Sequence, residues 1–209
     1  MLGLQLLAGA GVGYLIGSVS FAIVVSKLLG LADPRSYGSH NPGATNVLRS
    51  GSRVAAAITL LGDALKGAVA VWLVAALTPQ FDVPTTSIGA VAALAGLGAF
   101  IGHLFPVFFG FAGGKGVATF LGVVLAINPW LALAVCGIWI AVAAVTRYSS
   151  VASLTVAVAT PLLQAVLWSA DARFGAFALM ALLMIVRHRA NIAKLRAGTE
   201  SRIGGRRGD

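Results

Sequence analysis

Residues 2–31 read LGLQLLAGAGVGYLIGSVSFAIVVSKLLGL, an apolar run in which Lys27 is the only charged residue. A membrane-spanning helix needs about 20 predominantly apolar residues, so this run is long enough to cross a bilayer. Similar runs occupy residues 54–77, 88–105, 130–145 and 151–168, and shorter ones occupy 117–127 and 174–186. The runs are continuously apolar, which favours helices over the alternating strands of a β-barrel. The sequence therefore predicts an all-α, polytopic membrane bundle with seven transmembrane helices, of which the two short ones suit tilted or re-entrant segments.

The composition of the whole chain also indicates that lipid is its main solvent. Of the 209 residues, 58% are hydrophobic and 10% are charged, and the mean hydropathy is +0.93. A typical globular domain carries about 25% charged residues. A large catalytic domain outside the membrane is thus excluded, and the single Cys136 excludes a disulfide framework. We expect one membrane domain at residues 1–198 and a basic cytoplasmic tail at 199–209.

The distribution of basic residues predicts the orientation. With the N-terminus outside and seven crossings, the inside segments are 32–53, 106–116, 146–150 and 187–209. Lys27 adjoins the first of them, and of the other Lys and Arg residues only Lys66 and Arg173 lie elsewhere. This asymmetry is what the positive-inside rule requires. We therefore expect the N-terminus outside and the C-terminus in the cytoplasm.

Small residues recur at four-residue spacing in two of the apolar runs. Gly9, Gly13 and Gly17 form one such stripe, and Gly98 and Gly102 form another. Stripes of this kind allow the backbones of two membrane helices to approach closely. The sequence therefore predicts close helix packing at both places.

The polar residues of the inside segments indicate a site for anions. Residues 33–53, 102–119, 146–150 and 187–192 are expected to converge on the cytoplasmic face, and Asp33 is their only carboxylate. Cations, hydroxyls and backbone N–H groups in this proportion suit phosphate. In the first segment the candidate ligands surround Pro42, and they are Ser39, Asn41, Gly43, Thr45, Asn46 and Arg49. The alternative is a solvated turn that caps a helix.

A glycine-lysine motif is the second candidate. Gly113, Gly114 and Gly116 flank Lys115 and can form a backbone nest for phosphate oxygens, with the lysine as a point charge. The motif is not a Walker A loop, because Phe109 and Gly116 stand where that loop needs glycine and a hydroxyl residue. The alternative is a flexible turn whose lysine only reports orientation.

Ionisable residues inside a membrane helix are functional candidates by default. Asp63 and Lys66 lie one turn apart, so they either neutralise each other or leave Lys66 to reach a ligand. His188 and Asn191 share a helix face, and His103 follows a glycine near an inner helix end. A metal site is not expected, because no carboxylate or cysteine is near these histidines in sequence. Ser149 and Ser150 begin a helix, where N-capping explains only one of them.

Taken together, these segments resemble one known family. They are GSHNPGATNVLR (38–49), GDALKG (62–67), GHLFPVFFGFAGGKGVAT (102–119), RYSS (147–150), RHRANI (187–192) and GTE (198–200). In this order they resemble the bacterial membrane acyl-phosphate:glycerol-3-phosphate acyltransferase family (PlsY-type). The resemblance runs from Gly17 to Glu200. His40 departs from it, because a small residue such as glycine is expected there.

The resemblance implies that a fatty acyl group moves from acyl phosphate to the 1-hydroxyl of glycerol 3-phosphate, giving lysophosphatidate and phosphate at the cytoplasmic side of the bacterial inner membrane. It implies membrane lipid as surroundings, and no cofactor, metal, nucleic acid or obligate protein partner. Catalysis would fall to Lys115, Ser39 and Arg49, and support to Asp63, Lys66 and His103. Glycerol 3-phosphate would be held by Ser39, Arg49, Lys115, His188 and Asn191. Acyl phosphate would be held by Asn41, Gly43, Thr45, Asn46, Gly113, Gly114, Gly116, Ser149 and Ser150.

Two other functions compete with this interpretation. A small membrane transporter of a phosphorylated solute would suit the intramembrane Asp63 and Lys66. A transporter, however, should carry polar groups in both leaflets. Here the glycine-rich and cationic segments are expected on one face, and the outer segments 78–87 and 127–129 contain no basic residue. A metal-dependent enzyme acting on a lipid phosphate would need an acidic cluster that the sequence lacks.

Overall fold

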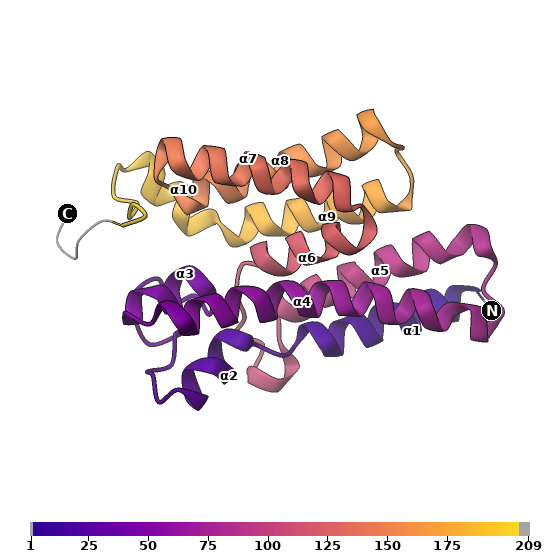
Figure 1. Ribbon diagram of the computed structural model, residues 1–209, viewed down its shortest axis with the longest axis horizontal. Helices are drawn as coiled ribbons and strands as arrows, with labels where there is room; N and C mark the ends of the chain where they lie inside the picture. Colours follow the sequence, from indigo (N-terminus) through magenta and orange to yellow (C-terminus); the bar gives the residue numbers. More distant parts are fainter. Residues whose placement is uncertain (1, 205–209) are drawn as a thin grey trace. The chain divides into compact units, whose positions relative to one another are not determined.

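The computed structural model describes residues 2–204, and in this part of the chain all regular structure is helical, with no strand. The chain divides into two compact units, the first ending at Ile127 and the second beginning at Asn128 (Figure 1). The first unit contains α1 (Leu2–Gly17), α2 (Phe21–Leu28), α3 (Ala44–Val47), α4 (Arg53–Leu77), α5 (Thr85–Leu104) and α6 (Val117–Ile127), with 3₁₀ turns at Leu48–Ser50, Thr78–Phe81 and Val107–Phe109. The second contains α7 (Pro129–Thr146), α8 (Ser149–Leu167), α9 (Ala172–Arg187) and α10 (Arg189–Arg196).

Five helical segments of the described chain are long and apolar enough to cross a membrane. They are Leu2–Leu28, Arg53–Phe81, Thr85–Phe109, Pro129–Thr146 and Ser149–Leu167. A sixth arises if α9 and α10 form one span bent by 55°, and α6 is a shorter apolar helix of 11 residues. The predicted all-helical membrane architecture is thereby confirmed, whereas the seventh crossing and the orientation remain predictions.

The first predicted span is interrupted. Helix α1 ends at Gly17, and α2 begins only at Phe21 and leaves the line of α1 (Figure 1). At the break the Ser18 hydroxyl donates to the Tyr14 carbonyl (2.8 Å), and the Val19 carbonyl accepts from Lys66 Nζ (2.6 Å). The Lys66 ammonium thus compensates the Val19 carbonyl, which a continuous helix would otherwise satisfy. The expectation of one continuous helix over 2–31 was therefore wrong.

The close helix packing predicted from the glycine stripes is confirmed. A Cβ on Gly13 would overlap the carbonyl oxygen of Ala95, and one on Gly98 would overlap that of Ala10. The backbones of α1 and α5 are thus in direct contact along the stripe. This contact anchors the end of α5, where the Tyr14 hydroxyl donates to the Phe105 carbonyl (2.9 Å).

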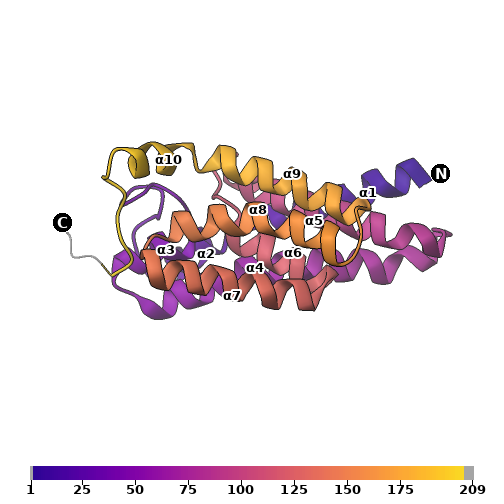
Figure 2. The ribbon, with the colours of Figure 1, turned by 90° about the horizontal axis from the view of Figure 1, so that it is seen from above.

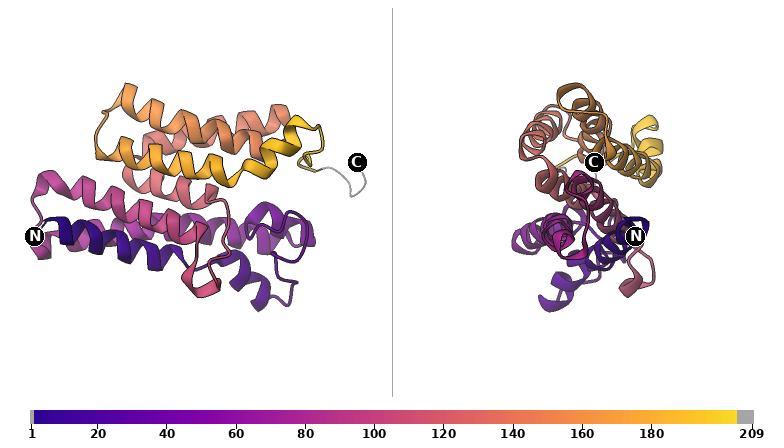
Figure 3. Two further views of the ribbon diagram at one scale, coloured as in Figure 1. Left: turned by 180° about the vertical axis from the view of Figure 1, so that it is seen from behind. Right: turned by 90° about the vertical axis from the view of Figure 1, so that its right-hand side faces the viewer.

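In the second unit α8 packs against both α7 and α9, as Figure 3 shows for the three long helices. The Trp139 indole donates to the Ser153 hydroxyl (3.2 Å) between α7 and α8. Helix α9 begins after its N-cap Asp171, slightly before the predicted start. At His188 the chain turns into the short basic helix α10 (Figure 2).

Candidate functional site

The loop between α2 and α4 is organised around Asn46. This side chain is buried, and its Oδ1 accepts from the Ser39 backbone N–H (3.0 Å). Its amide group donates to the carbonyls of Pro34 (2.6 Å) and Tyr37 (3.1 Å). Both amide hydrogens are therefore used within the protein. Sequence reasoning placed Asn46 on the acyl phosphate, whereas its contacts show a residue that shapes the loop.

Gly38 allows the loop to close on itself. Its φ of +62° is in the left-handed region, and a Cβ there would overlap Asn46 Oδ1 and lie 3.2 Å from Arg49 Cδ. The Arg49 side chain, which is exposed, therefore lies across Gly38 beside Ser39. Sequence reasoning did not single out Gly38, although it begins the motif at 38–49.

Three of the predicted ligand residues in this loop have uncommitted side chains. Within residues 2–204 the side chains of Ser39, Asn41 and Thr45 make no hydrogen bond, and none of them is fully buried. Their hydroxyl and amide groups can therefore serve a ligand, in contrast to Asn46. Ser39, Asn41 and Thr45 are therefore candidate ligands, whereas Asn46 stabilises the loop.

The loop's single carboxylate is neutralised locally. Asp33 forms an ion pair with Arg35 (2.7 Å), and hydrogen bonds from that guanidinium lower the pKa of the carboxyl below its usual value. Arg35 also donates to the Phe109 carbonyl (3.4 Å), which ties the loop to the segment after α5. His40 has a φ of +55°, a conformation that favours glycine, so the expectation of a small residue there has a physical basis.

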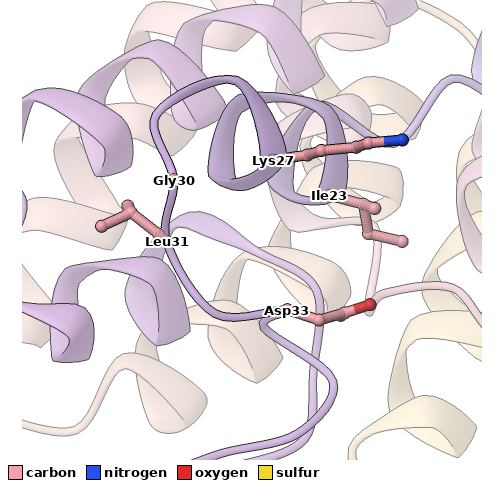
Figure 4. A pocket seen from close by; sticks show the side chains of 5 residues that line it. All are labelled: Ile23, Lys27, Gly30, Leu31 and Asp33. Atoms are coloured by element: carbon pink, nitrogen blue, oxygen red, sulfur yellow. The ribbon is translucent and has the colours of Figure 1, made fainter.

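A small cavity lies beside the start of this loop (Figure 4). It measures about 330 Å³ and is lined by Ile23, Lys27, Gly30, Leu31 and Asp33. The side chains of Lys27 and Asp33 extend on either side of Ile23. None of the predicted ligand residues lines this cavity.

The glycine-lysine motif packs tightly against α5 and against the first loop. A Cβ on Gly113 would overlap the His103 carbonyl, and Gly116, with a φ of +84°, leaves no room for one beside Phe100. On Gly114 a Cβ would lie 2.9 Å from the Pro42 carbonyl oxygen. The structure thus brings the two predicted phosphate segments side by side, with Lys115 half-buried between these glycines.

A buried ionic cluster lies behind the motif. The Lys66 ammonium is 2.8 Å from Asp63 Oδ1, and His103 Nδ1 is 3.6 Å from the same oxygen. All three side chains are nearly inaccessible to solvent. Of the two alternatives for Asp63 and Lys66, mutual pairing is the one observed. The ammonium group is engaged by Asp63 and by the Val19 carbonyl.

In the second unit Glu200 joins two predicted ligand residues. Its Oε1 accepts from the Ser150 hydroxyl (2.8 Å) and from the Asn191 side-chain amide (2.6 Å). Glu200 was absent from the predicted site, although the GTE segment at 198–200 was part of the recognised pattern. Neither serine at the start of α8 is its N-cap, because that position belongs to Tyr148, and the capping interpretation was wrong. Within the described residues the Ser149 hydroxyl makes no hydrogen bond.

His188 occupies the corner between α9 and α10. It is buried, and its Nδ1 lies 2.8 Å from the Met184 carbonyl oxygen, so Nδ1 carries the hydrogen and donates it. In a neutral ring Nε2 is then the acceptor nitrogen, and in a protonated ring it is a second donor. Among the described residues no three His, Cys, Asp or Glu side chains are grouped as a metal site requires.

The long apolar helices place the chain in the class of polytopic integral membrane proteins. Comparison with known proteins specifies the family. The family model described as Glycerol-3-phosphate acyltransferase matches residues 7–198. The chain belongs to this family, and it is an acyltransferase.

Two curated relatives illustrate the similarity. The glycerol-3-phosphate acyltransferase of Ralstonia pickettii (strain 12J) is 59% identical over 191 residues, which cover 91% of this chain and 90% of that protein. The glycerol-3-phosphate acyltransferase of Laribacter hongkongensis (strain HLHK9) is 54% identical over 203 residues, covering 96% and 98%. The relationship therefore extends over nearly the whole of each chain.

Two solved structures share the fold. Both are of PlsY (YgiH), an integral membrane glycerol 3-phosphate acyltransferase. The glycerol 3-phosphate form has a TM-score of 0.85 at 37% identity and covers 95% of this chain and 96% of that one. The lysphosphatidic acid form has a TM-score of 0.83 at 36% identity and covers 95% of each chain.

Proposed function

We propose that this acyltransferase moves a fatty acyl group from acyl phosphate to the 1-hydroxyl of sn-glycerol 3-phosphate, giving lysophosphatidic acid and inorganic phosphate, the first committed step of bacterial phospholipid synthesis. The observation that carries the proposal is the apposition of Pro42 and Gly114. It places the uncommitted side chains of the first loop next to the segment that bears Lys115. The names of the related structures, which include glycerol 3-phosphate and lysphosphatidic acid forms, support the same substrate and product.

The proposed reaction needs no nucleophile from the protein, because an acyl phosphate is already activated. The 1-hydroxyl oxygen attacks the acyl carbonyl carbon, a new ester C–O bond forms, and the bond from that carbon to the phosphate oxygen breaks. The departing phosphate takes the electron pair of that bond, and a phosphate oxygen of the donor or acceptor takes the hydroxyl proton. The protein positions two anions and stabilises the developing charge.

The residue roles are those that the sequence predicts, with one change at Asn46. We propose Lys115, Ser39 and Arg49 as catalytic residues that also hold glycerol 3-phosphate, together with His188 and Asn191. The acyl phosphate is assigned to Asn41, Gly43, Thr45, Gly113, Gly114, Gly116, Ser149 and Ser150. Asn46 moves from this group to the support of the loop, because both its amide hydrogens are bonded to backbone carbonyls.

For the membrane arrangement we propose seven crossings with the N-terminus outside, in the bacterial inner membrane. The reactive loops then lie on the cytoplasmic side. The support is the placement of basic residues, of which only Lys66 and Arg173 fall away from the inside segments. The proposed domain covers residues 1–198, and its basic tail, 199–209, lies partly outside the described residues.

Purified protein in detergent, incubated with palmitoyl phosphate and glycerol 3-phosphate in the presence of EDTA, tests the proposal. We expect lysophosphatidate by mass spectrometry and an equal amount of released phosphate. Lys115→Ala should lose at least 100-fold in kcat, in the range reported for removing one group that stabilises developing charge. Lys194→Ala, a matched change at an exposed lysine of α10, should not. Glycerol 3-phosphate flux into liposomes without product would support the transporter instead.

A further inference from the structure

His103 lies between a buried carboxylate and the glycine-lysine motif. On one side its Nδ1 is 3.6 Å from Asp63 Oδ1. On the other side its ring lies so close to Gly114 that a Cβ on that glycine would overlap Nε2. The exposed fraction of His103 is 6%, so its imidazole is packed in one position against the glycine-lysine motif and does not move freely in solvent.

The backbone of His103 also contacts the glycine-lysine motif. Its carbonyl oxygen accepts a hydrogen bond from the Gly114 N–H (3.1 Å). The same oxygen is packed against the Cα of Gly113, where a Cβ would overlap it. Two consecutive glycines before Lys115 therefore take their positions from one residue of α5.

The imidazole ring of His103 is also fixed on the side that faces away from the glycine-lysine motif. Asp63 is 2% exposed and lies between His103 and the Lys66 ammonium, which is 2.8 Å from its Oδ1. Lys66 in turn donates to the Val19 carbonyl at the break between α1 and α2. A buried ion pair is costly to form and costly to break, so such a pair keeps its partners in one arrangement.

We propose that His103 is a positioning residue, which holds Gly113 and Gly114 so that Lys115 is presented to the substrate phosphate, with Asp63 and Lys66 fixing the ring. This inference rests on the proposed function of Lys115. Without the imidazole, residues 113–116 sample other conformations. The apparent affinity for glycerol 3-phosphate then falls in proportion to the fraction of molecules that keep the binding conformation. Saturating substrate restores the competent conformation, so the defect is in KM rather than in kcat.

Steady-state kinetics and hydrogen exchange test this together. His103→Ala should raise the KM for glycerol 3-phosphate at least tenfold and lower kcat less than threefold, whereas Lys115→Ala lowers kcat. The same variant should show several-fold faster amide exchange in a peptide covering 113–116. Thr59→Val, a buried neighbour of Asp63 on α4, is the matched control and should change neither quantity. His103→Gln serves for both measurements if the alanine variant does not fold.

The role of Asp63 is tested by removing the ion pair without leaving a buried charge. Asp63→Asn with Lys66→Met should raise the same KM and the same exchange rate, by less than His103→Ala does. Combining these changes with His103→Ala should add nothing further, because Asp63 acts through the ring. Full additivity would contradict this coupling.

A folded His103→Ala protein with KM within twofold of the wild type and unchanged exchange at 113–116 would overturn the proposal. The exchange measurement needs no substrate. If the wild type makes no lysophosphatidate, the proposed function fails, and the exchange rates still decide whether His103 positions the segment.

Discussion

Asn191 donates a 2.6 Å hydrogen bond from its side-chain amide to the carboxylate of Glu200, nine residues further along the chain. The same carboxylate oxygen accepts from Ser150, fifty residues earlier in the sequence. The carboxylate therefore fixes the direction of a side chain that we assign to glycerol 3-phosphate. Glu200 therefore orients two proposed ligand residues without being a proposed ligand itself.

Replacing Glu200 should lower the stability of the protein, because Ser150 and Asn191 both donate to its carboxylate. Glu200→Ala leaves two donors without their acceptor and should lower stability by about 2–4 kcal/mol, while Glu200→Gln keeps an uncharged acceptor and should cost about 1 kcal/mol. Thermal unfolding in detergent gives the comparison. Asp82→Asn, which neutralises an exposed carboxylate, should leave the Tm unchanged. Equal effects of the two Glu200 variants would show that the charge contributes nothing.

Asn46 is the corresponding test in the first loop. Asn46→Asp keeps the acceptor for the Ser39 N–H but directs a carboxylate oxygen at the carbonyls of Pro34 and Tyr37. We expect a loss of about 2–4 kcal/mol and at least a tenfold loss of activity, because a buried amide donor is replaced by a repelling acceptor. Thr45→Ala, at the exposed neighbouring position, should leave the Tm unchanged. An Asn46→Asp protein as stable as the wild type would argue against the structural role.

The contact between α1 and α5 predicts a sharp difference between two glycines of one helix. Gly13→Ala places a methyl group on the Ala95 carbonyl and should cost at least about 2 kcal/mol, a Tm decrease of roughly 4–8 °C. Gly11→Ala meets no atom within 4 Å and should be neutral or slightly stabilising. Thermal unfolding of both variants checks this, and similar Tm values for the two would be inconsistent with the close approach.

Asp171 should give the second unit a small pH dependence. Hydrogen bonds from Arg173 lower the pKa of this carboxyl from 3.8 to about 2. Because the folded pKa is depressed, the stabilisation is complete above pH 3.8 and is lost as the pH falls towards 2. Both side chains are more than one-third exposed, so the effect should stay below about 1 kcal/mol. Unfolding curves of Asp171→Asn and wild type should differ at pH 6 and converge near pH 2.

Hydropathy predicted the helices well because burial in lipid depends on composition over a long window. The predicted run at 117–127 coincides with α6, and the pairing of Asp63 with Lys66 follows from their spacing on one helix. The break after Gly17 was missed, because two polar residues, Ser18 and Ser20, barely change the hydropathy of so long an apolar run. Its stabilising partner, Lys66, lies 47 residues away, and such a contact leaves no local signal.

The site was predicted at the level of segments rather than of individual roles. Asparagine suits a phosphate ligand and a loop support equally well, so only the contacts distinguish Asn46 from Asn41. The importance of Glu200 depends on how the turn after α10 folds back, which neither its residue type nor its position reveals. His40 shows the opposite case, because the resemblance alone indicated a position that favours glycine, and its φ of +55° explains why.

The ion pair between Asp63 and Lys66 also bears on how the protein reaches its membrane. The two charges lie three residues apart on α4, so they can neutralise each other as soon as that helix forms, before any other helix has arrived. A lone Asp or Lys at the centre of a span raises the free energy of insertion by about 2.5–3.5 kcal/mol. Losing either residue alone would thus first impair the integration of α4 during synthesis, upstream of any effect on catalysis.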